Sequence, residues 1–138
     1  MTKTQKENKK VIESFHEALN ALDFEKVEDL LADNATMGGP GAERVQGAKQ
    51  ITESLIESLI TNLKMKSLRC EILSIDAVGP YIVDDRIDWG EYGDEKVKVG
   101  AHVSGSYIVE NGKILDWTEW LSPEAGEALA NVAPDWQA

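Results

Sequence analysis

Cysteine and histidine are scarce in this 138-residue sequence, which has one cysteine, Cys70, and two histidines, His16 and His102. One cysteine excludes an internal disulfide and fits a reducing compartment, where it is more typical of a small buried apolar residue than of a nucleophile. The cysteine and the two histidines do not have the spacing of metal ligands, so no metal is expected. Both histidines are expected to be structural.

Basic residues are few as well: the formal net charge is −11, and no lysine or arginine follows Lys113. A surface this acidic repels phosphate backbones and anionic lipid heads. The lysines within residues 3–10 are interleaved with polar residues, as is typical of a solvated helix face. Neither a nucleic acid nor a membrane is therefore expected as a partner.

Long apolar runs are absent, because no stretch approaches the roughly 20 residues that a membrane span needs. The opening segment, MTKTQKENKK, lacks the apolar core of a signal peptide, so a cytoplasmic location is expected. What is present is the composition of a folded chain, with 42% hydrophobic and 28% charged residues. The length predicts a single domain over residues 1–138.

Apolar residues recur with helical spacing in the first half of the chain. They predict a helix over residues 4–22, a second helix that opens at the N-cap Asp23, and a third over residues 48–63. Between the last two helices, MGGPG at residues 37–41 cannot stay helical and indicates a loop or an irregular strand end. The first half is therefore expected to supply three helices.

After Lys64 the pattern changes to the alternation of strands. Turn signals divide this half, and the strongest is Asn111-Gly112, which is typical of a hairpin. The predicted strands are residues 66–77, 81–91, 96–109 and 113–121. Helices followed by an antiparallel meander indicate an α+β fold with the helices packed against one face of the sheet.

Charged residues share one face of the strand predicted over residues 81–91. Because side chains alternate along a strand, Asp84, Arg86 and Asp88 point to the same side. On this face of the strand, the nearest side chain to Arg86 in each direction is therefore a carboxylate. The opposite side of the strand carries Val83, Ile87 and Trp89.

Glu119 on the last predicted strand shares its face with Trp117 and Leu121. A carboxylate between large apolar groups is either exposed on an outer face or held in an apolar pocket by a partner. In the first alternative, Arg86 and Asp88 form a solvated ion pair. In the second, the cost of burying a charge unpaired predicts that Arg86, Asp88 and Glu119 converge in one cavity between sheet and helices.

The other face of the predicted sheet is apolar. An antiparallel sheet whose second face is apolar is normally covered, which predicts a homodimer formed through this outer face. Of the four tryptophans, Trp117 is the one expected beside a ligand, and core or interface packing accounts for most of the others, Trp136 included. The residues assigned to the outer face are Val83, Ile87, Trp89, Ile114 and Trp120.

The order helix, helix, loop, helix, meander resembles the nuclear transport factor 2-like (SnoaL-like, cystatin-like) superfamily. Within it, DRID at residues 85–88, ENGKILDW at 110–117 and the following Thr118-Glu119-Trp120 resemble the limonene-1,2-epoxide hydrolase family. The resemblance implies a cone-shaped curved antiparallel sheet wrapped around three helices. The opening residues that carry it are Val11, Phe15, Ala18, Leu19, Asp23, Leu30, Leu31 and Asp33.

The family resemblance implies roles for particular residues. Arg86 matches the family's bridging arginine and Asp88 its general acid, and Glu119 stands in place of its catalytic aspartate. Met37 and Gly39 occupy the places of a tyrosine and an asparagine that help to hold the attacking water. The residues expected to line a substrate pocket are Leu19, Met37, Ala101, Val103, Trp117 and Leu121.

Three functions follow as alternatives. The first is cofactor-independent hydrolysis of a small apolar epoxide to a diol by Arg86, Asp88 and Glu119, which retention of these residues favours. The second is a ketosteroid-isomerase-like or polyketide-cyclase-like enzyme that moves a proton next to a carbonyl, with Asp88 or Glu119 as the base. The third is a non-catalytic protein that binds a small molecule. The residues at positions 37 and 39 favour the second and third alternatives.

Overall fold

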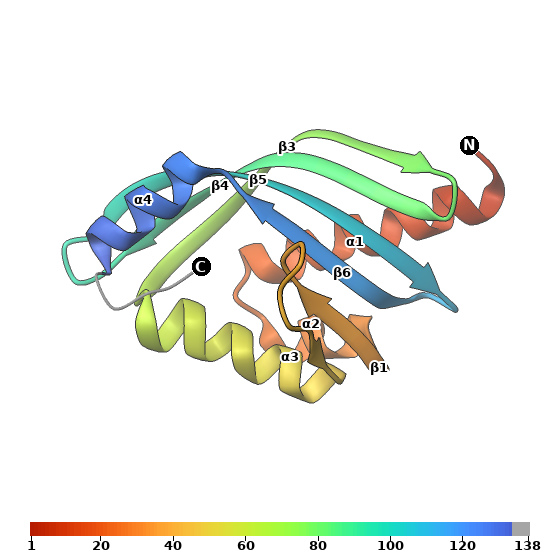
Figure 1. Ribbon diagram of the computed structural model, residues 1–138, viewed down its shortest axis with the longest axis horizontal. Coiled ribbons are helices and arrows are strands. Elements are labelled where there is room, and N and C mark those ends of the chain that lie inside the picture. The colour runs from red at the N-terminus through yellow and green to blue at the C-terminus, as the bar shows by residue number, and fades with distance from the viewer. Residues whose placement is uncertain (134–138) are drawn as a thin grey trace.

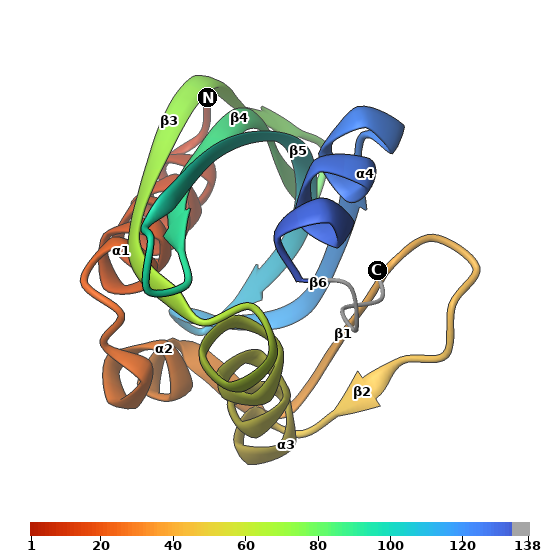
Figure 2. The same cartoon turned by 90° about the vertical axis from the view of Figure 1, so that its left-hand side faces the viewer.

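The structure of the protein is a computed structural model that describes residues 1–133. The prediction for Trp136 and the end of the predicted domain lie outside the described residues. Helices and strands of this part of the chain form an α+β fold in which a curved, unclosed sheet holds helices in its concave side (Figures 1 and 2).

The helices begin where the sequence offers caps. Helix α1, Lys3–Asn20, opens with a capping box, because Thr2 and Gln5 exchange side-chain to backbone hydrogen bonds of 2.9 and 3.1 Å. Helix α2, Phe24–Leu30, starts at the predicted N-cap, where Asp23 accepts a hydrogen bond from the backbone of Lys26. Helix α3, Ala48–Leu55, continues as the π-helix η1, Ile56–Asn62.

Six strands form one sheet in the order β2-β1-β6-β5-β4-β3. The four long ones follow one another as an antiparallel meander, and each lies within one residue of its predicted bounds at either end. The long strands therefore confirm the strand assignment made from alternation. The bounds are β1 Leu31–Gly38, β2 Val45–Gln46, β3 Met65–Val78, β4 Tyr81–Tyr92, β5 Val97–Glu110 and β6 Lys113–Leu121.

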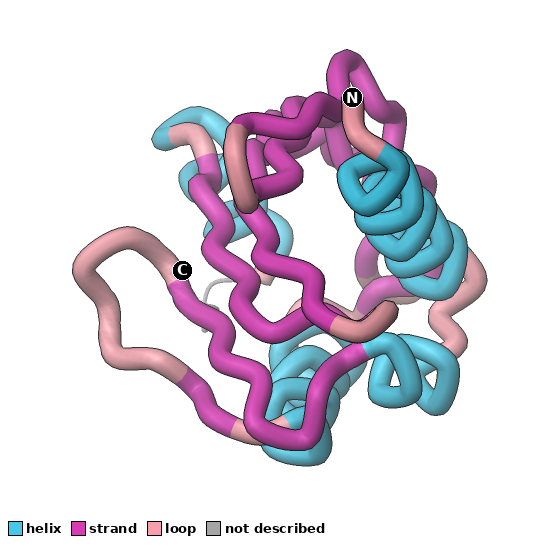
Figure 3. The backbone as a smooth tube through the Cα atoms, turned by 90° about the vertical axis from the view of Figure 1, so that its right-hand side faces the viewer, coloured by secondary structure: helices cyan, strands magenta, loops and turns pink. Residues whose placement is uncertain are grey.

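The predicted α+β fold with a curved sheet is confirmed, but the sheet is not antiparallel throughout. Strand β1 runs parallel to β6, with Met37 opposite Trp117, so the sheet is mixed. The sequence extends the second helix to Leu31 and indicates a loop or an irregular strand end at residues 37–41, because β1 has no clean alternation. In the structure β1 ends at Gly38, as the second of these alternatives expects. Its pairing with β6 shifts register between Leu31 and Thr36. In Figure 3 the loop after β1 projects from the sheet before the chain returns through β2.

The prediction of three helices was also incomplete. A further helix, α4, spans Pro123–Val132; it begins at Ser122, which accepts a hydrogen bond from the backbone of Ala125. A serine N-cap followed by proline is a common helix start, so the signal was present in the sequence. Helix α4 lies beside the far ends of β5 and β6 (Figure 2), and Leu129 is buried there.

One residue assigned to the outer face lies on the inner one. Ile114 is fully buried in the core, because β6 carries an extra residue, Leu115, at a bulge opposite Ile108 and Val109. An inserted residue shifts the alternation by one position, so Ile114 and Trp117 both point inward. Of the other residues assigned to the outer face, Trp120 is 44% exposed.

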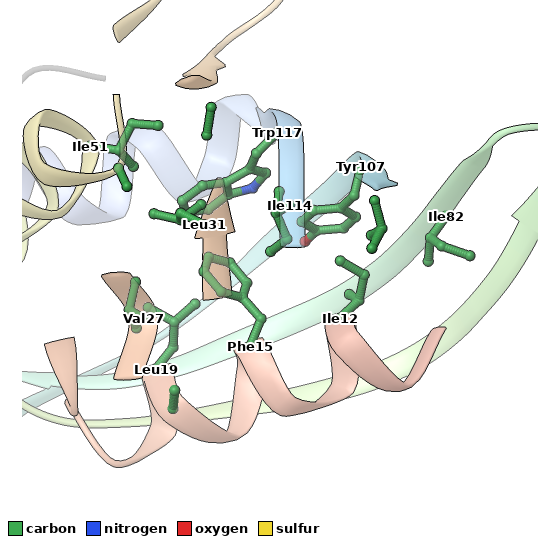
Figure 4. Close-up of a cluster of buried hydrophobic side chains, with 14 residues drawn as sticks. Ile12, Phe15, Leu19, Val27, Leu31, Ile51, Ile82, Tyr107, Ile114 and Trp117 are labelled. Carbon is green, nitrogen blue, oxygen red and sulfur yellow. The ribbon is translucent and has the colours of Figure 1, made fainter. Parts of the chain in front are cut away.

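The main core lies between α1 and the concave face of the sheet. Phe15 of α1 meets Trp117 of β6 edge-on, with ring centroids 4.9 Å apart (Figure 4). Tyr107 of β5 packs beside both rings, with centroids 6.4 Å from each. Buried aromatic rings in such contacts hold α1 against β5 and β6, and they fix the orientation of the strands that carry the charged residues.

Candidate active site

Alternation along β4 turns Asp84, Arg86 and Asp88 toward the helices, and β6 presents Glu119 on the same side of the sheet. Strand β5 lies between these two strands. At the level of Glu119 it has Gly105, where an added Cβ would lie 2.9 Å from Asp84 Oδ1. The missing side chain at Gly105 therefore leaves room for charged groups to meet across β5.

Arg86 is the centre of this group, and its side chain is 2% exposed. Its Nε donates a hydrogen bond to Asp88 Oδ1 at 2.8 Å, and its Nη2 donates to Asp88 Oδ2 at 3.3 Å and to Glu119 Oε1. Its Nη1 donates to Asp84 Oδ1 at 2.9 Å and to the Tyr107 hydroxyl at 3.1 Å. One guanidinium thus contacts three carboxylates, and it brings together the three residues that the sequence placed in one cavity.

A second layer of buried polar groups holds Asp84. Its Oδ2 accepts hydrogen bonds from the Tyr107 hydroxyl and from Nε2 of His16, both at 2.7 Å. His16 and Tyr107 are 3% and 0% exposed, so this layer is closed to water. Their participation was missed, although Asp84 was placed on the face of Arg86. No local pattern links a histidine on a helix to a tyrosine on a distant strand.

The electrostatics of Asp84 and Arg86 favour their charged forms. Burial alone would raise the pKa of Asp84, but the hydrogen bond with His16 and the charge of Arg86 lower it below its ordinary value. Burial alone would lower the pKa of Arg86, but the carboxylate of Glu119 and the other anions raise it. Asp84 and Arg86 therefore form a permanently charged pair that anchors the site.

Glu119 is shifted in the opposite direction. Burial raises its pKa, Arg86 offsets part of this effect, and the charge of Asp88 adds to the rise. About a third of its side-chain surface, 32%, is still accessible, and the residue lines the cavity described below. Glu119 is therefore the carboxyl group of this site whose proton affinity the surroundings increase.

The charged residues form part of the wall of a cavity of about 330 Å³. Apolar side chains make up most of the remaining wall. The cavity is lined by each of the nine residues proposed from the sequence as catalytic or substrate-binding: Leu19, Met37, Arg86, Asp88, Ala101, Val103, Trp117, Glu119 and Leu121. The sequence did not identify the part of the wall made by Leu55, Ser58, Leu59, Leu63, Met65, Leu68, Tyr92 and Leu129.

Met37 and Gly39, which stand where the family has its water-holding residues, both line the cavity. Parallel pairing of β1 with β6 places Met37 opposite Trp117, and a Cβ at Gly39 would lie 3.7 Å from the carbonyl oxygen of Glu119. These positions are therefore next to Glu119. Met37 contributes a thioether and Gly39 no side chain, so neither offers the hydroxyl or amide of the family pattern.

Other residues considered from the sequence lie apart from this cavity wall. His102 is exposed and bonds to Asp85, 2.5 Å away. Burial, and then the charge of Asp88, raise the pKa of the Cys70 thiol, so it stays protonated at neutral pH. Among residues 1–133 no group of three or more potential ligands could hold a metal ion, and no helix is long and apolar enough to cross a bilayer.

Solved structures define the class of fold. An M. tuberculosis epoxide hydrolase described as like limonene-1,2-epoxide hydrolase matches with a TM-score of 0.76 and 21% identity, covering 95% of this chain and 94% of that chain. A hypothetical protein with a ketosteroid isomerase-like fold from Catenulispora acidiphila matches with a TM-score of 0.72 and 11% identity, covering 93% of this chain and 97% of that chain. A putative SnoaL-like polyketide cyclase from Shewanella denitrificans matches with a TM-score of 0.74 and 10% identity, covering 88% of this chain and 95% of that chain. The fold is therefore of the nuclear transport factor 2 and SnoaL-like class.

The family is narrower than the fold. The model of the limonene-1,2-epoxide hydrolase catalytic domain matches residues 6–123. The chain therefore belongs to the limonene-1,2-epoxide hydrolase family. Comparison with curated protein sequences gives no match.

Proposed function

We propose that the protein hydrolyses a small apolar epoxide to a diol without a cofactor, with Glu119 as base, Asp88 as acid and Arg86 as the bridge between them. The observation that carries the proposal is the guanidinium of Arg86, which bonds to both carboxyl groups at the wall of a largely apolar cavity. Membership of the family supports the reaction class. The residues themselves support an acid and a base that act on one bound molecule.

The reaction needs one proton on the pair of carboxyl groups. Asp84, Asp88 and Glu119 around the single Arg86 carry two surplus negative charges when all three are ionised, and a buried site of this kind retains a proton readily. In the reactive form Asp88 is protonated and Glu119 is ionised. The raised pKa of Glu119 makes it a stronger base than an exposed carboxylate.

In the chemical step, the oxygen of a water molecule attacks one epoxide carbon while that carbon's bond to the epoxide oxygen breaks. Glu119 takes a proton from the water, and Asp88 gives its proton to the leaving oxygen. Water and epoxide together become a vicinal diol, with no change of oxidation state in the protein. After the step Glu119 carries the proton taken from the water and Asp88 is ionised. Transfer of one proton from Glu119 to Asp88 restores the starting form.

The cavity supports a small, uncharged and apolar substrate. Its 330 Å³ is near the lower end of the range found for small-molecule sites. Surplus negative charge on Asp88 and Glu119 disfavours an anion. We propose that substrate contacts come from Leu19, Met37, Ala101, Val103, Trp117 and Leu121.

A second candidate function is proton transfer next to a carbonyl, as in an isomerase or a cyclase. Met37 and Gly39 favour it, because neither side chain replaces the family's water ligands beside Glu119. A buried carboxylate with a raised pKa is suited to abstract a proton from carbon. In this case the cavity needs no bound water.

The discriminating experiment uses a panel of terpene and cyclic epoxides in water enriched in ¹⁸O. Hydrolysis predicts a diol that contains one labelled oxygen, formed by the wild type and not by Asp88→Asn. The same protein is incubated with cyclic ketones in D₂O, where an isomerase or cyclase site predicts deuterium next to the carbonyl. Incorporation of deuterium into the ketones without any diol formation would replace the hydrolase proposal with the isomerase or cyclase. A protein that catalyses neither reaction but binds these molecules is a binding protein.

We also propose that the outer face of the sheet pairs with a second copy of the chain. Its exposed apolar residues support this proposal, because an open patch of this kind is normally covered. A cytoplasmic location remains an expectation that a single cysteine supports. The exposed residues include Leu73, Val78, Tyr81 and Trp120, which are 53%, 57%, 42% and 44% exposed.

A further inference from the structure

Tyr92 ends strand β4 and belongs to the same wall of the cavity as Asp88. The two residues are four positions apart on one strand, so they face the same side of the sheet with Gly90 between them. Tyr92 is 4% exposed and lines the cavity, as does Asp88. The proposed mechanism gives no role to this tyrosine.

The ring of Tyr92 lies back along β4, over Gly90. A Cβ added at Gly90 would be 2.4 Å from the Tyr92 hydroxyl oxygen and 2.5 Å from its Cζ. The end of the ring therefore occupies the space that a side chain at residue 90 would take. Because the ring starts at residue 92 and its hydroxyl sits above residue 90, the side chain is directed toward Asp88.

No described residue satisfies the Tyr92 hydroxyl. Among residues 1–133 it makes no hydrogen bond, and the residues paired with Gly90 on the adjacent strands are the apolar Leu68 and Val99. The fully buried side-chain atoms without a partner in this part of the chain are His16 Nδ1 and Trp117 Nε1. The Tyr92 hydroxyl is not one of them, so it stays accessible from the cavity.

The charge state of the phenol is settled by its surroundings. Burial raises the pKa of Tyr92 to about 12, and the negative charge of Asp88 contributes to the rise. The hydroxyl therefore keeps its proton over the whole range in which the site is active. It is a neutral hydrogen-bond donor near the proposed acid.

We propose that Tyr92 is a further catalytic residue whose hydroxyl donates a hydrogen bond to the leaving oxygen of the substrate beside Asp88. An epoxide oxygen has two lone pairs, so it accepts the proton of Asp88 on one and this hydrogen bond on the other. As the carbon–oxygen bond breaks, negative charge develops on that oxygen, and a donor already in place stabilises it. Tyr92 keeps its own proton throughout, so the proton balance of the step is unchanged.

This role divides the site into two ends, and it rests on the proposed function. Asp88 and Tyr92 hold the oxygen that leaves, whereas Glu119, which shares Nη2 of Arg86 with Asp88, activates the water. The oxygen of the substrate is thereby aligned along β4. A bound diol product has a hydroxyl group at the same place, so the phenol also contributes to product affinity.

The first variant is Tyr92→Phe, which removes the hydroxyl and keeps the ring packed among Leu63, Met65 and Leu129. We expect kcat for diol formation to fall about 10²-fold to 10³-fold, as for loss of one donor to a developing oxyanion. The matched control is Tyr81→Phe, since Tyr81 is 42% exposed and outside this cavity, and its kcat should stay within about twofold. Thermal unfolding shows whether both variants are folded.

A second variant keeps the hydroxyl and moves it. In Gly90→Ala the new methyl group occupies the space of the phenol end, so the ring must shift away from its position beside Asp88. We expect a lower kcat in this variant and no further loss when Gly90→Ala is added to Tyr92→Phe. This variant decides the question if Tyr92→Phe does not fold, because an unchanged kcat in Gly90→Ala then overturns the proposal.

A binding measurement separates this inference from the proposed function. Calorimetric titration with cyclohexane-1,2-diol should give a weaker affinity for Tyr92→Phe than for the wild type, and no change for Tyr81→Phe. A wild type that forms no diol from any epoxide overturns the hydrolase proposal and this inference with it. An active wild type with full kcat and unchanged diol affinity in Tyr92→Phe overturns the role of Tyr92 alone.

Discussion

The guanidinium of Arg86, on strand β4, donates a hydrogen bond to Glu119, on strand β6, across the intervening strand β5. The contact is possible because the middle strand has small residues at this level, including Gly105. It joins Glu119, whose pKa is raised, to Arg86, which is always positively charged.

Replacing Glu119 by glutamine should remove diol formation by at least about 10³-fold, because an amide does not accept the proton of the attacking water. Asp88→Asn should have a comparable effect on the other half of the step, and the two losses should be far from additive because both groups serve one transition state. Product formation is measured by gas chromatography, and folding by circular dichroism. The control is Glu110→Gln, an exposed residue at the end of β5, which should stay fully active. Full activity in both carboxamide variants would make the site structural.

The pH dependence of kcat/KM should follow Glu119. Because the base must be ionised and its pKa is raised, activity should increase with pH through that raised value, and it should fall again at higher pH, where the pair loses the proton that the acid donates. The rising limb should therefore lie above the pH at which an ordinary glutamate ionises, near about 4.3. Initial rates between pH 3.5 and 9, taken in buffers of constant ionic strength, test this expectation. A rate that is already at its plateau near the ordinary value contradicts it.

Stability should depend on pH through Asp84. Its pKa is lowered in the folded protein, so its ion pair contributes stability above the ordinary aspartate pKa and loses it as the pH falls through the lowered value. Asp84→Asn should therefore lower the free energy of unfolding at pH 7 by about 3–5 kcal/mol, because Arg86 and His16 lose a buried partner. Urea denaturation at pH 7 and pH 3 measures the difference between variant and wild type, which should shrink at pH 3. Asp94→Asn, an exposed aspartate, serves as the control.

Restoring the family residues by Met37→Tyr with Gly39→Asn should raise diol formation, by an amount on the order of tenfold if a water ligand is what the site lacks. The structure has room for at least the start of such a side chain, since a Cβ at Gly39 meets its nearest atom at 3.7 Å. Each single variant provides the comparison, with the product measured as for Glu119→Gln. A double variant that folds and is no faster than the wild type would show that another group already holds the water.

A homodimer through the outer face predicts a mass in solution of twice 15.2 kDa. Trp120→Lys should dissociate it, because a charge would then replace an exposed ring on the outer face. Light scattering coupled to size exclusion at micromolar concentration measures the mass. Gln50→Lys, which adds the same charge at an exposed position of helix α3, should leave it unchanged. A monomeric wild type refutes the prediction.

Periodicity was sufficient for much of this protein. The spacing of Ile12, Phe15 and Leu19 determines α1, and alternation after Lys64 determines the four long strands. Both patterns are local, because the order of apolar and polar residues within one segment shows which side chains face the core. The same alternation placed Arg86 and Asp88 on one face. In the motif DRID at residues 85–88, Arg86 and Asp88 are the second and fourth residues, and the resemblance of this motif to a family then pointed to Glu119 as their partner.

Tertiary structure decided the rest, because it depends on contacts between segments that are far apart in the chain. The bulge at Leu115 reverses the side on which Ile114 lies, and β1 becomes a strand only because β6 pairs with it. His16 enters the site through a bond to Asp84, 68 residues away, which no spacing in the sequence reports. The strand predicted from the sequence ends at residue 91 and leaves Tyr92 just outside it, whereas in the structure Tyr92 ends β4 and the space above Gly90 lets its hydroxyl lie toward the cavity.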